Sequence, residues 1–191
     1  MADTRGFQEH WLNIDPERME RYETMYQWNP ATEAFYTPAK IGEGHVVGDF
    51  GCGPGHAAIE FAKRVGPTGH VHALDINAEF VRRARARAEA NSFGDRITVH
   101  LLEDVQLPLP DAGLDRMVAR NTIIYVPDPV TTFGEFRRVL RPGGIAHAIE
   151  GDLNSHPLRV CLTRSHWRWF SEHDEIFAAK RAYSLDFGDP W

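Results

Sequence analysis

Apolar and polar residues alternate along the middle of the chain with two different periods. Five short apolar runs have the length and composition of buried strands: 45–50, 71–74, 97–102, 114–119 and 145–149. Three longer segments between them carry their apolar residues on one helical face: 55–65, 77–90 and 129–140. This alternation predicts an α/β fold with a doubly wound, mostly parallel sheet. Right-handed crossovers would bring the carboxyl ends of the parallel strands to one rim, where ligands bind in such folds.

Residues 1–40 are polar and rich in aromatic side chains, and they predict a helical extension ahead of the first strand. Asp15-Pro16 has the residue types of a helix start, and Asn29-Pro30 those of a helix end. Residues 31–40 predict a second short helix or turn. The aromatic residues of the extension either pack it onto the domain or form a lid over a ligand site, and both alternatives stay open. The first helix carries one apolar face: Met19, Tyr22, Met25 and Tyr26.

Composition narrows the class of protein. The 191 residues suffice for one domain with a sizeable core, with 42% hydrophobic and 25% charged residues. A net charge of −6 argues against a nucleic acid or an anionic membrane as partner. Two cysteines, one of them inside a glycine-rich turn, favour a reducing, cytoplasmic location. No apolar run approaches the ~20 residues of a membrane span, and the polar start of the chain does not have the pattern of a signal peptide.

A glycine-rich turn follows the first predicted strand. Asp49 is followed by glycines at alternate positions, Gly51, Gly53 and Gly55, and then by a predicted helix. Glycine permits positive φ angles and a close approach to the backbone, so a ligand can lie directly against such a turn. A nicotinamide-binding fold is the rival interpretation, but it would show the spacing G-x-G-x-x-G. The spacing here is G-x-G-x-G, which disfavours that rival.

Acidic residues recur where predicted strands end. Asp49 lies at the end of the first strand, Asp75 at the end of the second, and Glu103-Asp104 at the end of the third. Parallel strand ends share one rim, so these carboxylates are expected to meet there. Asp75 lies about twenty residues beyond the glycine turn, the spacing at which an acidic residue binds ribose hydroxyls in nucleotide sites.

Residues 42–152 resemble the class I S-adenosylmethionine (SAM) dependent methyltransferases, which have a Rossmann-like fold. The resemblance is closest to the small-molecule enzymes of the ubiquinone/menaquinone-biosynthesis type. Four segments carry it: Asp49-Phe50-Gly51-Cys52-Gly53-Pro54-Gly55, Ala73-Leu74-Asp75-Ile76, Leu114-Asp115-Arg116-Met117-Val118 and Phe136-Arg137-Arg138-Val139-Leu140-Arg141-Pro142-Gly143-Gly144. It implies an N-terminal extension at 1–40, a SAM-binding core at 41–152 and a C-terminal part at 153–191.

The resemblance implies SAM as cofactor. Asp75 would bind the ribose hydroxyls, and Asp104, or less readily Glu103, the adenine amino group. Ile76 and Val105 would enclose the adenine ring. The full set of expected cofactor-binding residues is Asp49, Gly51, Cys52, Gly53, Gly55, Asp75, Ile76, Glu103, Asp104, Val105, Arg120 and Asn121.

The acceptor side is less defined by the sequence. Tyr125 and Glu150 are the candidate catalytic residues, and no catalytic residue is assigned. Many relatives place paired histidines after the fourth strand, where this chain has Tyr125, which disfavours a metal or a histidine base at that position. No spacing of His, Cys, Asp and Glu predicts a metal site. His56 is a candidate for the methionine end of SAM, and His147 for a core position. The expected substrate-binding residues are Tyr22, Tyr26, Tyr36 and Tyr125.

The C-terminal part is atypically short for this family, whose sheet has seven strands. Residues 153–170 predict a helix carrying Leu158, Val160 and Leu162, and residues 182–187 at most one strand. The strand at 145–149, or the short strand at 182–187, would then be an open edge. One hypothesis is a homodimer that covers this edge, and the other is a shortened variant of a longer enzyme.

Two functions follow from these observations. The first is transfer of a methyl group from SAM to a small-molecule acceptor. The alternative is a non-catalytic SAM-binding or partner-binding module, which the short C-terminal part favours. Methylation of macromolecules is a weaker third interpretation, because the chain is acidic and shows no appended recognition domain. The arginines at 82, 83, 85 and 87 are interpreted as a solvated helix face.

Overall fold

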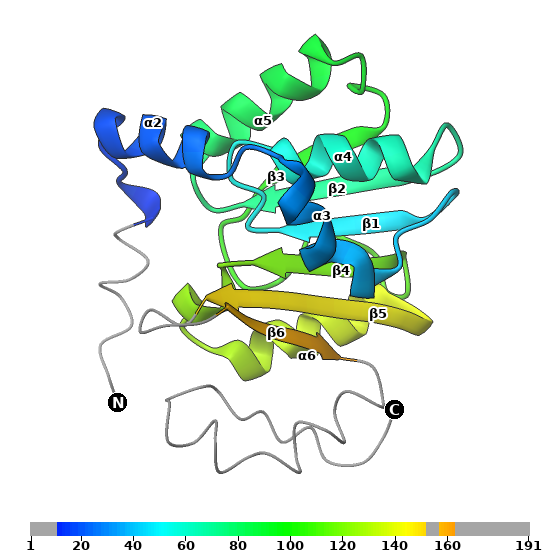
Figure 1. Ribbon diagram of the computed structural model, residues 1–191. Helices are drawn as coiled ribbons and strands as arrows, with labels where there is room; N and C mark the ends of the chain where they lie inside the picture. The colour runs from blue at the N-terminus through cyan, green and yellow to red at the C-terminus, as the bar shows by residue number, and fades with distance from the viewer. Residues whose placement is uncertain (1–10, 152–156, 163–191) are drawn as a thin grey trace.

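The computed structural model describes residues 11–151 and 157–162. They form a six-stranded sheet of order β3-β2-β1-β4-β5-β6 (Figure 1). The first five strands pair in parallel, and β6 pairs antiparallel with β5. The predicted α/β, Rossmann-like sheet is therefore confirmed. The strands are β1 (Val46–Phe50), β2 (His70–Asp75), β3 (Ile97–Leu101), β4 (Leu114–Arg120), β5 (Leu140–Gly151) and β6 (Pro157–Leu162).

Helices pack on both faces of this sheet and divide the core in two. One apolar cluster joins β1, β2 and β3 to α4, α5 and the N-terminal extension around the fully buried Phe61. The other joins β4 and β5 to α6 around Phe136 and Met117. Figure 1 shows α4 and α5 on one side of the sheet and α6 on the other. The helices are α2 (Pro16–Met25), α3 (Pro30–Tyr36), α4 (His56–Val65), α5 (Ala78–Ala90) and α6 (Pro129–Val139).

Short polar side chains fix the start of most of these helices. Asp15, Asn29, Asn77 and Asp128 each accept hydrogen bonds from backbone N–H groups in the first turn of the following helix. α4 differs, because its N-cap is Gly55 in the left-handed region at φ 85°. The start of α4 therefore depends on glycine rather than on a capping side chain.

One proline and two glycines give Arg141-Pro142-Gly143-Gly144 the composition of a tight turn ahead of the fifth predicted strand. In the structure it lies inside β5, which begins at Leu140. Leu140 pairs with Leu114 and Ile145 with Arg116, so the register shifts across this segment. Gly143, at φ 79°, accommodates the irregularity. The strand is interrupted at these residues but does not start after them.

The predicted helix at 153–170 is wrong for residues 157–162, which form β6. Leu158, Val160 and Leu162 recur at every second position, which is the period of a strand. β6 pairs along β5 from Gly151↔Pro157 to Ala146↔Leu162, so β5 is not the edge of the sheet, and the prediction that the open edge lies at 145–149 is wrong. Asp152, the rest of the predicted helix and the strand predicted at 182–187 lie outside the described residues.

The N-terminal extension lies along the α4 and α5 side of the sheet (Figure 1). α3 continues into a short 3-10 helix, Thr37–Ala39. The buried His147 of β5 has its Nε2 atom 2.7 Å from the carbonyl oxygen of Phe35, which confirms the expected core position of this histidine.

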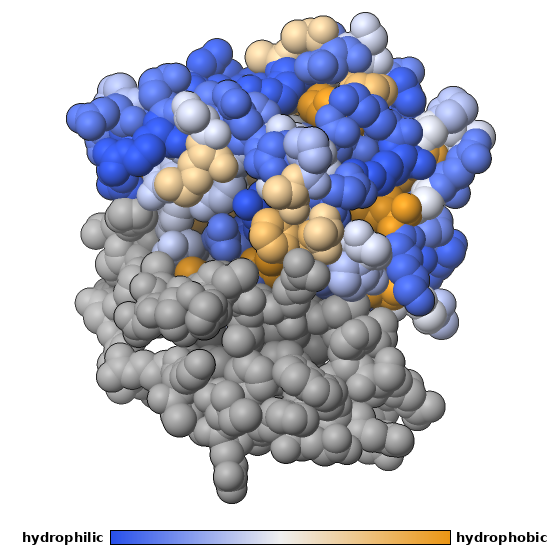
Figure 2. Space-filling view, viewed as in Figure 1, coloured by the Kyte–Doolittle hydropathy of each residue, from blue (hydrophilic) through white to orange (hydrophobic). Residues whose placement is uncertain are grey.

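Figure 2 shows that the outer surface over α2, α4 and α5 is largely hydrophilic. Along the described part of the chain, no helix has the length and apolar character needed to cross a membrane.

Candidate active site

A cavity of about 440 Å³ lies at the carboxyl ends of β1, β2, β3 and β4. The strand order reverses between β1 and β4, and ligands of doubly wound sheets bind at such a switch point. Its walls come from the ends of these strands, from the loop before α6 and from two residues of the N-terminal extension, Trp11 and Tyr26.

The glycine turn after β1 forms part of the cavity wall, through Gly51 and Gly53. The N–H groups of Gly51 and Cys52 both donate to the carbonyl oxygen of Leu74, at 2.8 and 3.0 Å. Gly51 has φ 73°, and a Cβ atom there would lie 2.2 Å from Oγ1 of Thr122. Gly53, at φ 51°, differs because a Cβ atom there would meet no atom within 4 Å. Gly51 is thus required by packing, whereas Gly53 leaves open space beside the cavity that it lines.

Asp75 lines the cavity and also holds the glycine turn. Its Oδ2 atom accepts a hydrogen bond from Gly53 N at 2.8 Å, and its Oδ1 atom one from Asn77 N at 2.8 Å. Burial raises the pKa of Asp75 to about 6, against the opposing effect of these hydrogen bonds. The carboxylate is therefore mostly ionised at neutral pH, and it joins the turn after β1 to the start of α5.

Three expected cofactor-binding residues, Asp49, Cys52 and Gly55, do not line the cavity. Asp49 is buried within β1, and its Oδ2 atom has no hydrogen-bond partner among the described residues. Burial and the charge of Asp75 raise the pKa of Asp49 to about 7, against the charge of Arg120. Burial likewise raises the pKa of the Cys52 thiol, which keeps it protonated.

The other nine expected cofactor-binding residues line the cavity: Gly51, Gly53, Asp75, Ile76, Glu103, Asp104, Val105, Arg120 and Asn121. The residues that follow β3, Glu103, Asp104 and Val105, are exposed, and 44% of the Val105 surface is accessible to solvent. Asp104 Oδ1 accepts from Gln106 N at 2.7 Å, which orders this short loop. The guanidinium of Arg120 lies 5.6 Å from the centre of the Tyr26 ring and 5.5 Å from that of Phe35, within cation–π range.

The expected substrate-binding tyrosines divide into two pairs. Tyr26 and Tyr125 line the cavity, whereas Tyr22 and Tyr36 do not. Tyr36 is 4% exposed and stacks on Trp28 within the core, where burial raises its pKa to about 12. Tyr22 lies behind the wall, against the rings of Trp11, Tyr26 and Phe80.

Glu150, a candidate catalytic residue, does not line the cavity. Its Oε1 atom accepts from Thr122 N at 3.0 Å and from Ile123 N at 2.8 Å. These bonds hold the start of the 3-10 helix Ile123–Tyr125, which carries the other candidate, Tyr125, into the wall. Burial raises the pKa of Glu150 to about 7, and its Oε2 atom has no hydrogen-bond partner among the described residues. The geometry supports a structural role for Glu150.

His56, the candidate for the methionine end of SAM, does not line the cavity either. Its Nε2 atom lies 2.9 Å from Oε1 of Glu23 in α2.

Sequence reasoning also missed several residues of the cavity wall. Local sequence signals explain Asp128 only as the cap of the helix that starts at Pro129 and Phe80 only as an apolar position of the helix at 77–90, and Trp11 has no local signal. The missed residues are Trp11, Phe50, Phe80, Leu102, Thr122, Val126, Pro127, Asp128, Thr131 and Thr132.

The fold and the cavity define an α/β domain with a ligand site at the switch point of its sheet. A family model described as a methyltransferase domain matches residues 41–185, and the chain belongs to this family. The family membership predicted from the sequence is thereby confirmed.

Individual relatives are consistent with this family. The chain is 34% identical over 113 residues to the methyltransferase GfsG of Streptomyces halstedii, covering 59% of this chain and 40% of that protein. It is 32% identical over 102 residues to a demethylmenaquinone methyltransferase of Geobacillus kaustophilus, covering 53% and 43%. The chain thus covers less than half the length of each. A SAM-dependent methyltransferase from Aquifex aeolicus shares the fold, with a TM-score of 0.63, 22% identity and coverage of 85% and 88%.

Proposed function

We propose that the chain is a SAM-dependent methyltransferase that acts on a small-molecule acceptor. The observation that carries this proposal is the combination of the open Gly53 turn, the carboxylate of Asp75 and the exposed Asp104 around one cavity. The names of the two curated relatives support methyl transfer, and the demethylmenaquinone enzyme supports a small-molecule acceptor. The net charge of −6 also disfavours a nucleic-acid substrate.

The residues present fit the cofactor. A ribose diol suits a carboxylate beside an open backbone turn, which is what Asp75 and Gly53 provide. The adenine amino group suits Asp104 or Glu103, with Ile76 and Val105 as apolar neighbours of the ring. Arg120 and Asn121 complete the set on the side of β4.

When bound, SAM supplies an electrophilic methyl group. The chain has to hold the acceptor in line with that group and to exclude water. We assign this task to Trp11, Tyr26 and Tyr125, the aromatic residues of the wall. Burial raises the pKa of Tyr125, so its hydroxyl stays protonated at neutral pH and is a hydrogen-bond donor rather than a base. General-base catalysis is needed only for acceptors that carry a proton at neutral pH.

Titration calorimetry with SAM, followed by turnover with labelled SAM and a panel of phenols, amines, thiols and quinols, tests the proposal. We expect binding with one site per chain and label transfer to at least one small molecule. Absence of SAM binding would refute the proposal. Binding without transfer to any acceptor would favour the alternative, a non-catalytic SAM-binding module. A cytoplasmic location and a homodimer stay predictions, which fractionation and light scattering would test.

A further inference from the structure

Residues 11–26, here called the cover segment, complete the wall of the cavity. Trp11 and Tyr26, at its two ends, both line the cavity. The Trp11 ring meets the Tyr125 ring edge to face, with centroids 4.8 Å apart. The side-chain amide of Asn77 donates to the carbonyl oxygen of Trp11 at 2.7 Å. The wall is therefore incomplete unless the cover segment stays on the domain.

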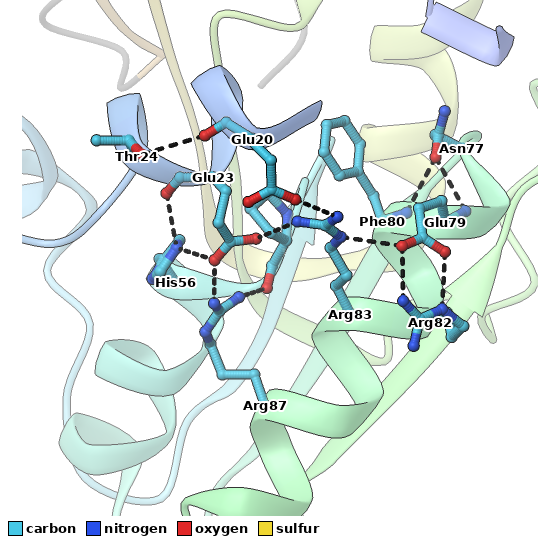
Figure 3. A network of polar contacts seen from close by, with 11 residues as sticks. Glu20, Glu23, Thr24, His56, Asn77, Glu79, Phe80, Arg82, Arg83 and Arg87 are labelled. Carbon is cyan, nitrogen blue, oxygen red and sulfur yellow. Dashed lines mark hydrogen bonds and ion pairs between the residues drawn. The ribbon is translucent and has the colours of Figure 1, made fainter. Parts of the chain in front are cut away.

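Glu23 is the centre of the contacts that hold the cover segment (Figure 3). Its Oε1 atom lies 2.9 Å from Nε2 of His56 and also accepts from Arg87, while its Oε2 atom accepts from Arg83 at 3.3 Å. The backbone carbonyl oxygen of Glu23 lies 3.1 Å from the same Nε2 atom. Because both neighbours of Nε2 are acceptors, this nitrogen carries the proton and donates to them.

The partners of Glu23 belong to the cofactor side of the cavity. His56 is the first residue of α4 and directly follows Gly55 of the glycine turn. Arg87 donates both to Glu23 and to the carbonyl oxygen of Pro54, inside that turn. One carboxylate thus connects the cover segment to the glycine turn through two separate side chains.

We infer that Glu23 is a positioning residue, which holds Trp11 and Tyr26 in the wall of the cavity by anchoring α2 to α4 and α5. The inference rests on the proposed function only for the choice of SAM as the ligand. Loss of the anchor would open the wall and let the ligand dissociate faster.

The other acidic residues of α2 do not share this position. The Glu23 side chain is 18% exposed, whereas that of Glu20 is 67% exposed and pairs, within the described part of the chain, with one cation, Arg83. Glu17 is 90% exposed, and its partner among the same residues is Arg21 of its own helix. Exposed pairs are weakened by solvent and salt. Removal of Glu23 would leave the partly buried Arg87 without an acidic partner among the described residues, whereas Arg83 would keep Glu20 and Glu79.

The test compares Glu23→Gln with the matched control Glu20→Gln, in the full chain. SAM affinity and dissociation rate are measured at low and high salt (about 20 and 300 mM). Hydrogen exchange of the α2 amides is measured without ligand. We expect Glu23→Gln to raise Kd about tenfold at low salt, mainly through faster dissociation, and to speed exchange in α2. For Glu20→Gln we expect a change below about twofold in both measurements.

A merely structural role would lower stability without this pattern. We therefore expect the salt dependence of the SAM dissociation rate to weaken in Glu23→Gln, and the charge-swapped double variant Glu23→Arg, Arg87→Glu to recover part of the affinity. Equal behaviour of Glu23→Gln and Glu20→Gln in affinity and exchange would overturn the inference. Failure of the unaltered chain to bind SAM would refute the proposed function, while the exchange data would still decide the role of Glu23. If Glu23→Gln does not fold, Arg87→Gln provides the same two measurements.

Discussion

The two sides of the cavity are built by different means. On the cofactor side, backbone groups set the geometry: Gly51 and Cys52 donate to Leu74, and Asp75 accepts from Gly53. These contacts join neighbouring strand ends of one sheet. On the acceptor side, side chains from distant segments set the geometry, and Trp11 packs on Tyr125 more than a hundred residues later in the sequence.

Because the two sides are built differently, amino-acid substitutions should affect them differently. A backbone cradle admits few substitutions, because each acts on φ angles or on main-chain hydrogen bonds. An aromatic wall can change its residues while it keeps a cavity of similar shape. The structure therefore predicts that substitutions on the cofactor side abolish folding or SAM binding, whereas those on the acceptor side change which acceptor reacts and how fast.

The largest effect is expected for Gly51→Ala. The alanine Cβ would lie 2.2 Å from Oγ1 of Thr122, at a residue with φ 73°. Strain and the clash together should lower the free energy of unfolding by about 3 kcal/mol. Gly134→Ala in α6 is the control, because a Cβ there meets no atom within 4 Å, and it should stabilise by about 0.5–1 kcal/mol. Denaturant unfolding measures both, and similar values for the two variants would contradict the requirement for glycine at 51.

Asp75→Ala should have the next largest effect, on SAM affinity. The variant loses the ligand contact and the acceptors of the Gly53 and Asn77 N–H groups, so we expect Kd to rise about 100-fold. Asp104→Ala, in an exposed loop, should raise Kd about tenfold without lowering Tm. Asp95→Ala, whose side chain is 83% exposed, is the control. Calorimetry showing unchanged affinity in Asp75→Ala would exclude Asp75 from the site.

The same contrast explains what the sequence could predict. The glycine turn, the acidic residues after β2 and β3 and the helix caps at Asp15 and Asn77 depend on neighbouring residues, and the structure places these where the local pattern indicated. Asp49 is the exception among the acidic residues, because it is buried within β1, and Asn29 caps the start of α3 instead of ending a helix. The side chains of Asp15 and Asn77 accept hydrogen bonds from N–H groups that lie two or three residues later in the sequence. Such contacts follow from residue type and spacing alone.

The features of the site that the sequence did not predict depend on contacts between residues far apart in the chain. Arg83 and Arg87 were interpreted as a solvated helix face, which is wrong, because α2 brings Glu23 against them from 60 and 64 residues away. Trp11 and Phe80 enter the wall for the same kind of reason. The wrong helix prediction at β6 differs, because a local signal for a strand is present there: Leu158, Val160 and Leu162 recur at every second position.

A third prediction concerns Glu150. Burial raises the pKa of its carboxyl from 4.5 to about 7. An acid with a raised folded-state pKa favours folding most below its unfolded pKa, and this contribution is lost as pH rises towards the folded value. The unaltered chain should therefore lose stability between about pH 5 and 8. Glu150→Gln keeps an acceptor for Thr122 and Ile123 and should reduce this loss by about 2 kcal/mol.

Denaturant unfolding across that pH range measures the effect. Glu17→Gln is the control, because its side chain is 90% exposed. An unchanged pH slope in Glu150→Gln would show that the Glu150 carboxyl ionises in the folded protein as it does in the unfolded chain.

The smallest effect, and the sharpest test of the contrast, is expected at Tyr125. Its ring packs on Trp11, and its hydroxyl is held protonated by burial. Tyr125→Ala should lower kcat/KM about tenfold for the best acceptor of the panel, because the wall no longer orients that acceptor. SAM affinity should stay within about threefold, since the cofactor side is unaltered and Glu23 still anchors the cover segment, which holds Trp11 and Tyr26 in the wall. Tyr125→Phe keeps the ring and should retain most of the activity. If Tyr125→Phe is as impaired as Tyr125→Ala while SAM affinity is unchanged, the hydroxyl takes part in the reaction, and the acceptor side is more than an aromatic wall.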